Sequence, residues 1–129
     1  MTDLSELRER LEKAEGPCRE LDLAICEALN LVEVEQDDII GPHPVVKLPG
    51  KTYCTAAPLT SSLDAAVALV ERQNRLWTME SGGAPSCVYI AQVCSGGDYP
   101  GWHEGASTTA ALALCTALLR AMEADDDRG

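Results

Sequence analysis

Hydrophobic residues are concentrated in a few segments of the chain, and the strongest segment is the last. Residues 107–122 read S-T-T-A-A-L-A-L-C-T-A-L-L-R-A-M, and between Ala110 and Leu119 only Thr116 is polar. A helix that is apolar on nearly all sides is buried, and this stretch is shorter than the roughly 20 apolar residues that span a membrane. We therefore predict a central core helix, whose alanine-rich side lets another backbone segment approach closely.

Two amphipathic helices are predicted near the amino terminus. In residues 4–14, leucines and an alanine recur at steps of three and four between charged residues, which is typical of a helix with one buried face. Gly16 and Pro17 end this helix, and proline is tolerated in the first turn of the next one, which is expected over residues 17–29. The leucine stripe of the first helix could instead be a dimer seam, and we expect a homo-oligomer.

A third helix is predicted over residues 60–71, from T-S-S-L-D-A-A-V-A-L-V-E. Ser61 is its expected N-cap, and Asp64 stands three residues later, as in a close relative of the capping box. The side chains of this helix that we expect to face the core are Leu63, Ala66, Val67 and Val70.

Four short segments rich in β-forming residues are predicted to be strands. V-V-K-L and K-T-Y-C-T are joined by Pro49-Gly50, which suits a type II turn because glycine accepts the positive φ. L-W-T-M-E and C-V-Y-I-A-Q-V-C form the other pair, whereas residues 33–44 and 95–106 are interpreted as connections. The predicted fold class is α+β, a small, mostly antiparallel sheet of about four strands flanked by helices in the order α-α-β-β-α-β-β-α.

The chain of 129 residues is acidic, with a formal net charge of −11. Its length suits one domain, which we place at residues 1–124, followed by a disordered acidic tail at 125–129. Residues 1–38 hold twelve acidic and four basic residues, whereas residues 39–124 are close to neutral. An acidic surface argues against binding nucleic acid polymers, which are held through Lys and Arg. We recognise no secretory signal or spanning segment, and we expect a cytoplasmic protein without a membrane partner.

The sequence carries no motif typical of an enzyme or a metal site. Its six cysteines form no C-x-x-C pair and stand at no ligand spacing from a histidine, so we expect free thiols, no bound metal and no cofactor. G-x-S-x-G, H-E-x-x-H and Walker A sequences do not occur. His103 beside Glu104 could form an acid–base pair, but a loop histidine is more often only solvated. We predict a protein that is not an enzyme.

The best candidate for a ligand site lies just before the last helix. Four glycines between residues 95 and 106 let a backbone approach a ligand closely. Nearby aromatic rings can stack on a base, and the helix start offers N–H groups and hydroxyls to a phosphate. Alternatively, the glycines only shape a connection, and Trp102 closes the edge of the core. The predicted ligand-binding residues are Tyr99, Trp102, His103, Ser107, Thr108, Thr109, Lys51, Arg72 and Arg75.

Three segments of the chain resemble a known family, the phage ABA sandwich domain family of small phage and prophage proteins. The segments are G-P-C-R-E-L-D-L-A-I-C-E-A-L, T-S-S-L-D-A-A-V-A-L-V-E and A-S-T-T-A-A-L-A-L-C-T-A-L-L-R-A. The resemblance covers nearly the whole chain and is loosest over residues 31–59. It implies a phage origin and a helix–sheet–helix architecture, and it implies no catalytic residues.

Two functions of different classes are consistent with these observations. The first, which we favour, is a non-enzymatic phage protein in the host cytoplasm that counters defence. It would sequester a small anionic nucleotide-type signalling molecule, such as a cyclic oligonucleotide or an ADP-ribose derivative. The second is an acidic interaction module that docks on a host or phage protein and inhibits it. The glycine, aromatic and hydroxyl residues before the last helix favour the first function, and the acidic amino-terminal region favours the second.

Overall fold

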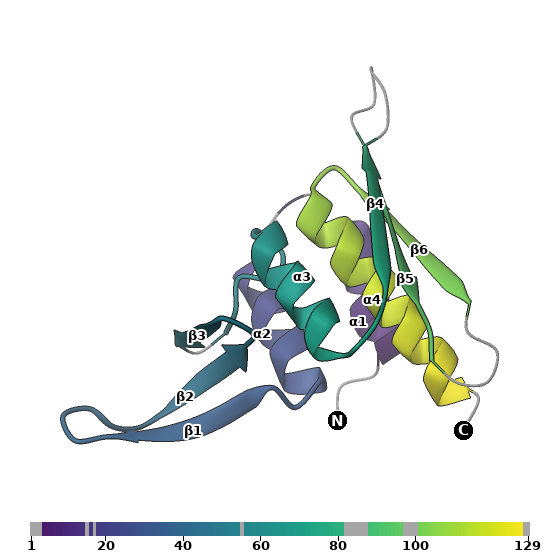
Figure 1. Ribbon diagram of the computed structural model, residues 1–129. Helices are drawn as coiled ribbons and strands as arrows, with labels where there is room; N and C mark the ends of the chain where they lie inside the picture. The colour runs from purple at the N-terminus through teal and green to yellow at the C-terminus, as the bar shows by residue number, and fades with distance from the viewer. Residues whose placement is uncertain are drawn as a thin grey trace.

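The computed structural model describes residues 4–14, 16, 18–54, 56–81, 88–96 and 101–127. Within these residues it confirms the α+β class, with four helices and six strands in two antiparallel sheets (Figure 1). The sheets have the strand orders β1-β2-β3 and β4-β5-β6. In chain order the elements are α1 (Leu4–Lys13), α2 (Arg19–Ala28), β1 (Val32–Asp37), β2 (Gly41–Leu48), β3 (Lys51–Cys54), α3 (Leu63–Arg72), β4 (Trp77–Ser81), β5 (Tyr89–Cys94), β6 (Trp102–Ser107) and α4 (Ala110–Asp127).

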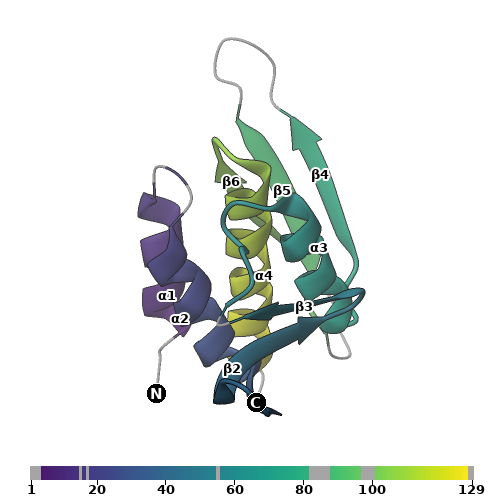
Figure 2. The ribbon, with the colours of Figure 1, turned by 90° about the vertical axis from the view of Figure 1, so that its left-hand side faces the viewer.

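Helix α4 lies at the centre of the molecule, and all of its residues from 111 to 119 are buried. The sheet β4-β5-β6 covers one side of this helix, while α1 and α3 pack against the sides that the sheet leaves open (Figures 1 and 2). The buried hydroxyl of Thr116 donates to the carbonyl of Leu112 at 2.9 Å, so its polar group is paired within the helix. The predicted central core helix is confirmed.

Strand β6 meets helix α4 at Gly105. A Cβ atom added there would lie 2.4 Å from the carbonyl oxygen of Ala113 and 2.6 Å from the backbone nitrogen of Ala117. No side chain fits in that space, so only glycine allows this contact. The alanine-rich side of the last helix thus admits a close backbone, as predicted. The prediction that Gly105 makes room for a ligand is wrong, because it makes room for α4.

The leucine stripe of α1 is buried inside the chain. Leu7 and Leu11 belong to the same core as α4, and α1 packs directly on that helix. The alternative of a dimer seam is therefore wrong for these leucines, because their surface is already covered. Two ion pairs join α1 and α4 beside this contact: Arg8–Glu123 and Arg120–Glu12.

A buried carboxylate, that of Asp22, ties helix α2 to the segment before α3. One of its oxygens accepts hydrogen bonds of 2.7 Å from both the backbone N–H and the hydroxyl of Thr60. Arg19 donates to the other oxygen at 3.0 Å. Since a buried charge without partners is costly, these bonds explain how an acid is accommodated on the inner side of α2.

Helix α3 begins later than predicted. Its N-cap is Ser62, not Ser61, and the Ser62 side chain accepts a hydrogen bond of 3.2 Å from the backbone N–H of Ala65. Leu63 is exposed rather than in the core, because it is the first helical residue and its side chain points back beyond the helix start. The buried residues of α3 are Ala65, Ala66, Leu69 and Val70.

Two segments predicted as connections are strands. Residues 33–44 supply most of β1 and half of β2, and residues 102–106 supply most of β6. Turn-forming Gly and Pro are dense in both, but pairing with a neighbouring strand outweighs local preference. The predicted turn at Pro49-Gly50 is consistent with the φ of +84° at Gly50. Helix α4 continues to Asp127, three residues beyond the domain end predicted at residue 124.

Candidate functional site

The predicted ligand residues of β6 are spread along an extended strand. Trp102 pairs with Cys94 at one end of β5, and Ser107 pairs with Tyr89 at the other. Five strand steps separate Trp102 from Ser107, which corresponds to roughly 16 Å. A phosphate at the start of α4 is therefore too far from Trp102 for the predicted stacking of its base. Tyr99 lies outside the described residues.

The hydroxyl groups before α4 already hold the backbone of the helix start. Thr109 Oγ1 accepts a hydrogen bond of 3.3 Å from the N–H of Leu112, and Ser107 Oγ accepts one of 3.4 Å from the N–H of Thr109. These are capping contacts, which use N–H groups that an anion would need. Thr108 is exposed. Beside it, a cavity of about 380 Å³ is lined by Glu12, Lys13, Ala14, Val88, Ala106, Ser107 and Thr108.

The three predicted basic residues do not converge on this cavity. Arg72 donates to the carbonyl of Lys47 at 2.5 Å, and the Lys51 ammonium lies 5.1 Å from the centre of the Tyr53 ring. Arg75 lies at the start of the segment that leads into β4, near the carboxyl end of α4. Of the predicted set, no basic residue lines the cavity beside Thr108, where the nearby cation is Lys13.

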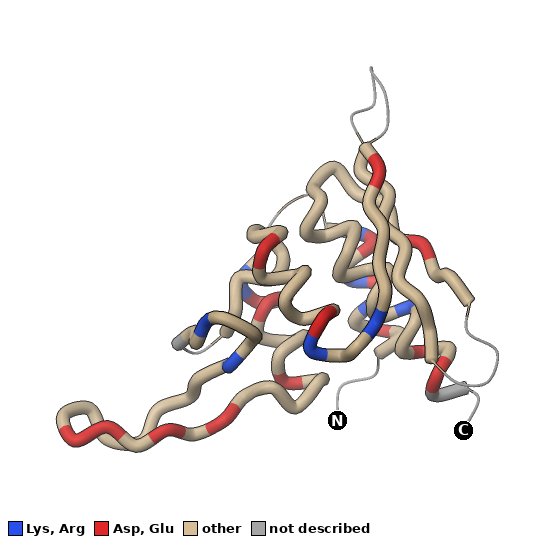
Figure 3. The backbone as a smooth tube through the Cα atoms, in the orientation of Figure 1, with Lys and Arg blue, Asp and Glu red and all other residues tan. Residues whose placement is uncertain are grey.

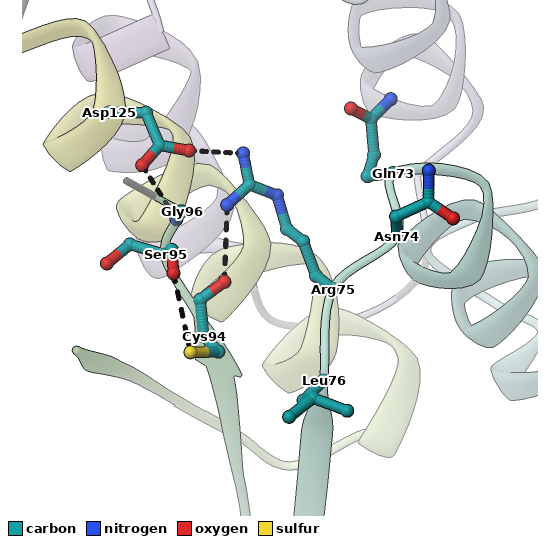
Figure 4. Close-up of a pocket in the computed structure, with 8 residues that line it drawn as sticks. All are labelled: Gln73, Asn74, Arg75, Leu76, Cys94, Ser95, Gly96 and Asp125. Carbon is teal, nitrogen blue, oxygen red and sulfur yellow. Dashed lines mark hydrogen bonds and ion pairs between the residues drawn. The ribbon is translucent and has the colours of Figure 1, made fainter. Parts of the chain in front are cut away.

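Arg75 lines a second cavity, of about 290 Å³, between the α3–β4 connection, the end of β5 and the end of α4 (Figure 4). Its guanidinium donates to the carbonyl of Cys94 at 3.2 Å and to the carboxylate of Asp125 at 2.5 Å. The same carboxylate accepts a hydrogen bond of 2.9 Å from the N–H of Gly96. Because Asp125 compensates the charge of Arg75, this cavity offers little net attraction to an anion.

The residues with catalytic potential are not assembled. His103 lies on the same face of β6 as Gly105, toward α4, and its Nε2 is buried without a hydrogen-bond partner. Glu104 is exposed on the opposite face, so the two do not form an acid–base pair. Burial raises the pKa of the Cys115 thiol to about 12, which leaves it protonated and unreactive. No group of residues suited to a metal ion occurs among the described residues, and all four cysteines whose side chains are described are free.

Three large apolar side chains of the β1–β2 hairpin (residues 32–48) are exposed. Ile39 is 92% exposed, Val34 71% and Ile40 66%. Figure 1 shows this hairpin extending away from the helices. Sequence reasoning missed it, although V-E-V-E-Q alternates apolar or neutral with acidic residues, as a strand does.

The tip of the hairpin has a defined conformation. The Asp37 carboxylate accepts hydrogen bonds from the N–H groups of Ile39 at 2.7 Å and of Ile40 at 3.2 Å. These two hydrogen bonds hold the pKa of Asp37 below its ordinary value, and the bond from Ile39 has the larger effect. Gly41 follows with a φ of +77°, as is common after a three-residue hairpin loop. The isoleucines are thus presented by a turn that the aspartate fixes.

The two faces of the hairpin differ in chemistry. Side chains alternate between the faces of a strand, so Glu33, Glu35 and Asp37 share one face, which we call the acidic face. Figure 3 shows the acidic positions following one another along this hairpin. The opposite face, which we call the apolar face, carries Val34 with its cross-strand neighbour Pro44, and Gln36 with Pro42.

Comparison with family models, with curated proteins and with solved structures finds no match to this chain. The resemblance to the phage ABA sandwich domain family therefore stays a prediction. No helix among the described residues is long and apolar enough to cross a membrane.

Proposed function

We propose that this protein is a non-enzymatic binding module that docks on another protein through the β1–β2 hairpin. The observation that carries this proposal is the exposure of Val34, Ile39 and Ile40 on one projecting element. Single exposed apolar residues are common on protein surfaces, whereas three on one projecting element favour an interaction site. A partner that covers them removes this apolar surface from water.

The charge of the hairpin supports the same function. The acidic face would attract a basic protein surface and repel nucleic acid. Docking on a host or phage protein would inhibit that protein by occupying its surface. The phage origin rests on the resemblance alone, and the counter-defence role rests in turn on that origin; both are part of the proposal.

Site-specific photo-crosslinking tests this docking role. A photoreactive residue is placed at Ile39 and, as a control, at the exposed Thr52 of β3. The protein is produced in bacterial cells, which the resemblance to a phage family makes the first choice. We expect one defined protein adduct from position 39, its loss when Ile40→Asp is added, and no such adduct from position 52. Equal labelling from both positions would show that the hairpin is not the docking element.

A second candidate is sequestration of a small nucleotide-type anion, the function that the sequence favours. It is favoured by the cavity beside Thr108, where Lys13 lies with Ser107, and not by the predicted arginines. A thermal-shift screen with cyclic di- and trinucleotides and ADP-ribose derivatives tests it, because a ligand of the folded state raises the melting temperature. Lys13→Ala should remove the shift, and Lys51→Ala should keep it. If no compound in the screen shifts the melting temperature, protein docking is the remaining candidate function.

A further inference from the structure

We infer that strand β1 takes up an extended basic segment of the partner protein as an additional strand of its sheet. This inference rests on the proposed docking function and names the chemistry of the partner. Strand β1 is an edge strand, because its sheet has the order β1-β2-β3. Residues 33–37 are all exposed. An exposed edge presents unpaired N–H and C=O groups to which another chain can bond.

The prolines of β2 determine which backbone groups of β1 face the open edge. Pro44 pairs with Val34, and Pro42 pairs with Gln36. A proline has no N–H to donate, so these pairs must be the non-hydrogen-bonded kind of the antiparallel ladder. The N–H and C=O groups of Val34 and Gln36 therefore point away from β2. Outside the strand ladders, no backbone–backbone hydrogen bond among the described residues involves Val34 or Gln36.

The same prolines close the other edge of the hairpin. Among the described residues, strand β3 pairs with residues 45–48 of β2, and Pro42 and Pro44 lie beyond the last of these pairs. Their missing N–H groups deprive an incoming strand of donors on that side. Strand addition to the hairpin is therefore directed to β1.

Charge selects the kind of strand that can be added. A second copy of β1 would place Glu33, Glu35 and Asp37 against the same residues of its partner, and like charges opposite each other destabilise a sheet. Glu35 lies 3.9 Å from the ammonium of Lys47 on the same face, but the face also carries the carboxylates of Glu33 and Asp37, so it complements Lys or Arg. The apolar face beside Val34 complements an apolar side chain. The partner segment thus alternates basic and apolar residues.

A synthetic peptide of alternating Lys and Val, eight residues long, with blocked ends and a fluorescent label, is the probe. We expect it to bind the intact protein with a change in anisotropy. A peptide of the same composition with four Lys followed by four Val should bind at least about tenfold more weakly, because in each of its halves every second side chain meets the face that does not suit it. Equal affinity of the two peptides would overturn the inference, since net charge alone would then explain binding.

Backbone methylation of the peptide separates strand addition from attraction between charges. One peptide is N-methylated at its Val residues and another at its Lys residues, which removes the N–H groups of one edge while keeping every charge. Strand addition requires that one of the two peptides loses binding and the other keeps it. If methylation at Val abolishes binding, the added strand is antiparallel, because the residue opposite Val34 then donates its own N–H. If methylation at Lys abolishes binding, the added strand is parallel, because the residues next to that position then make the bonds. Binding of both methylated peptides would overturn the inference.

Two protein variants complete the test. Val34→Pro removes an outward N–H without removing a bond to β2, so peptide binding should be lost while the melting temperature stays. Glu33→Gln with Glu35→Gln should weaken peptide binding about tenfold at low salt and less at high salt. The control, Glu71→Gln with Glu80→Gln, changes the net charge equally at two exposed positions elsewhere and should bind like wild type. If the control variant lost as much peptide affinity, net charge and not the acidic face would explain the effect.

The outcomes distinguish this inference from the proposed function. A protein adduct from position 39 without binding of the alternating peptide would leave hairpin docking intact and refute strand addition. Absence of both would refute the docking function as well.

Discussion

The two sheets of this molecule are used in opposite ways. The sheet β4-β5-β6 lies on α4 so closely that Gly105 touches the helix backbone, and its inward side chains are part of the core. The sheet β1-β2-β3 has a buried inner end at Val45 and Val46, whereas its outer end is exposed on both faces. One sheet is therefore held by packing, and the outer half of the other is held mainly by its own ladder and turn. Substitutions should separate these roles sharply.

The largest effect is expected at the centre of α4. Leu114→Ala or Leu118→Ala should lower the free energy of unfolding by about 2–5 kcal/mol, because each leaves a cavity among buried side chains. Urea denaturation followed by circular dichroism measures it. A loss below about 0.5 kcal/mol for both variants would contradict the central position of α4.

The next effect is at the contact between β6 and α4. Gly105→Ala should cost about 3 kcal/mol, since the new methyl group would overlap backbone atoms of Ala113 and Ala117. Gly101→Ala is the matched control in the same strand region, because no other atom lies within 4 Å of the added Cβ. It should change the free energy of unfolding by no more than about 0.5 kcal/mol. Similar costs for both would mean that glycine flexibility, not the contact, matters.

A smaller effect is expected at the ion pairs between α1 and α4. The hydrogen bond from Arg120 is the largest cause that lowers the pKa of Glu12 in the folded state. The stabilisation is therefore present above the unfolded pKa, near 4.3, and is lost as the pH falls through the lower folded value. Glu12→Gln should cost less than about 1 kcal/mol at pH 7. Its difference from wild type should shrink below about pH 4, as denaturation at several pH values would show; a constant difference would exclude the ion pair as its cause.

The smallest effect on stability is expected at the hairpin tip. Ile39→Ser with Ile40→Ser should change the free energy of unfolding by no more than about 0.5 kcal/mol, because both side chains are exposed. The same variant should lose the proposed protein docking. A clear loss of stability would show that the tip contributes to the core of the free protein.

The sequence allowed the helices to be predicted better than the strands, for physical reasons. Helical periodicity is local, so the leucines of α1 and the apolar run of α4 were sufficient to locate both elements. Strands β1 and β6 acquire their conformation by pairing with other strands, which the fold brings to them and neighbouring residues do not reveal. Taken alone, Pro44 and Gly105 indicate turns.

The candidate ligand site could not be predicted for a related reason. Residues close in sequence are close in space within a loop or a helix, but an extended strand separates them. A single site at Trp102 and Ser107 requires a loop, and β6 places the two residues at opposite ends of a strand. The hairpin is hard to predict because Pro42 and Pro44 in a sequence indicate turns rather than a strand. In the structure both lie beyond the described β2–β3 pairs, at positions that need no N–H for pairing with β1.

The central position of α4 affects the order in which the chain can fold during synthesis. The ribosome makes this helix after every other element described here, and α1 packs on it from the opposite end of the sequence. The core therefore cannot close until α4 has emerged, whereas the β1–β2 hairpin needs only contacts between residues close in sequence and can form early. The segment that we assign to partner recognition can thus take shape on the nascent chain before the body that will carry it.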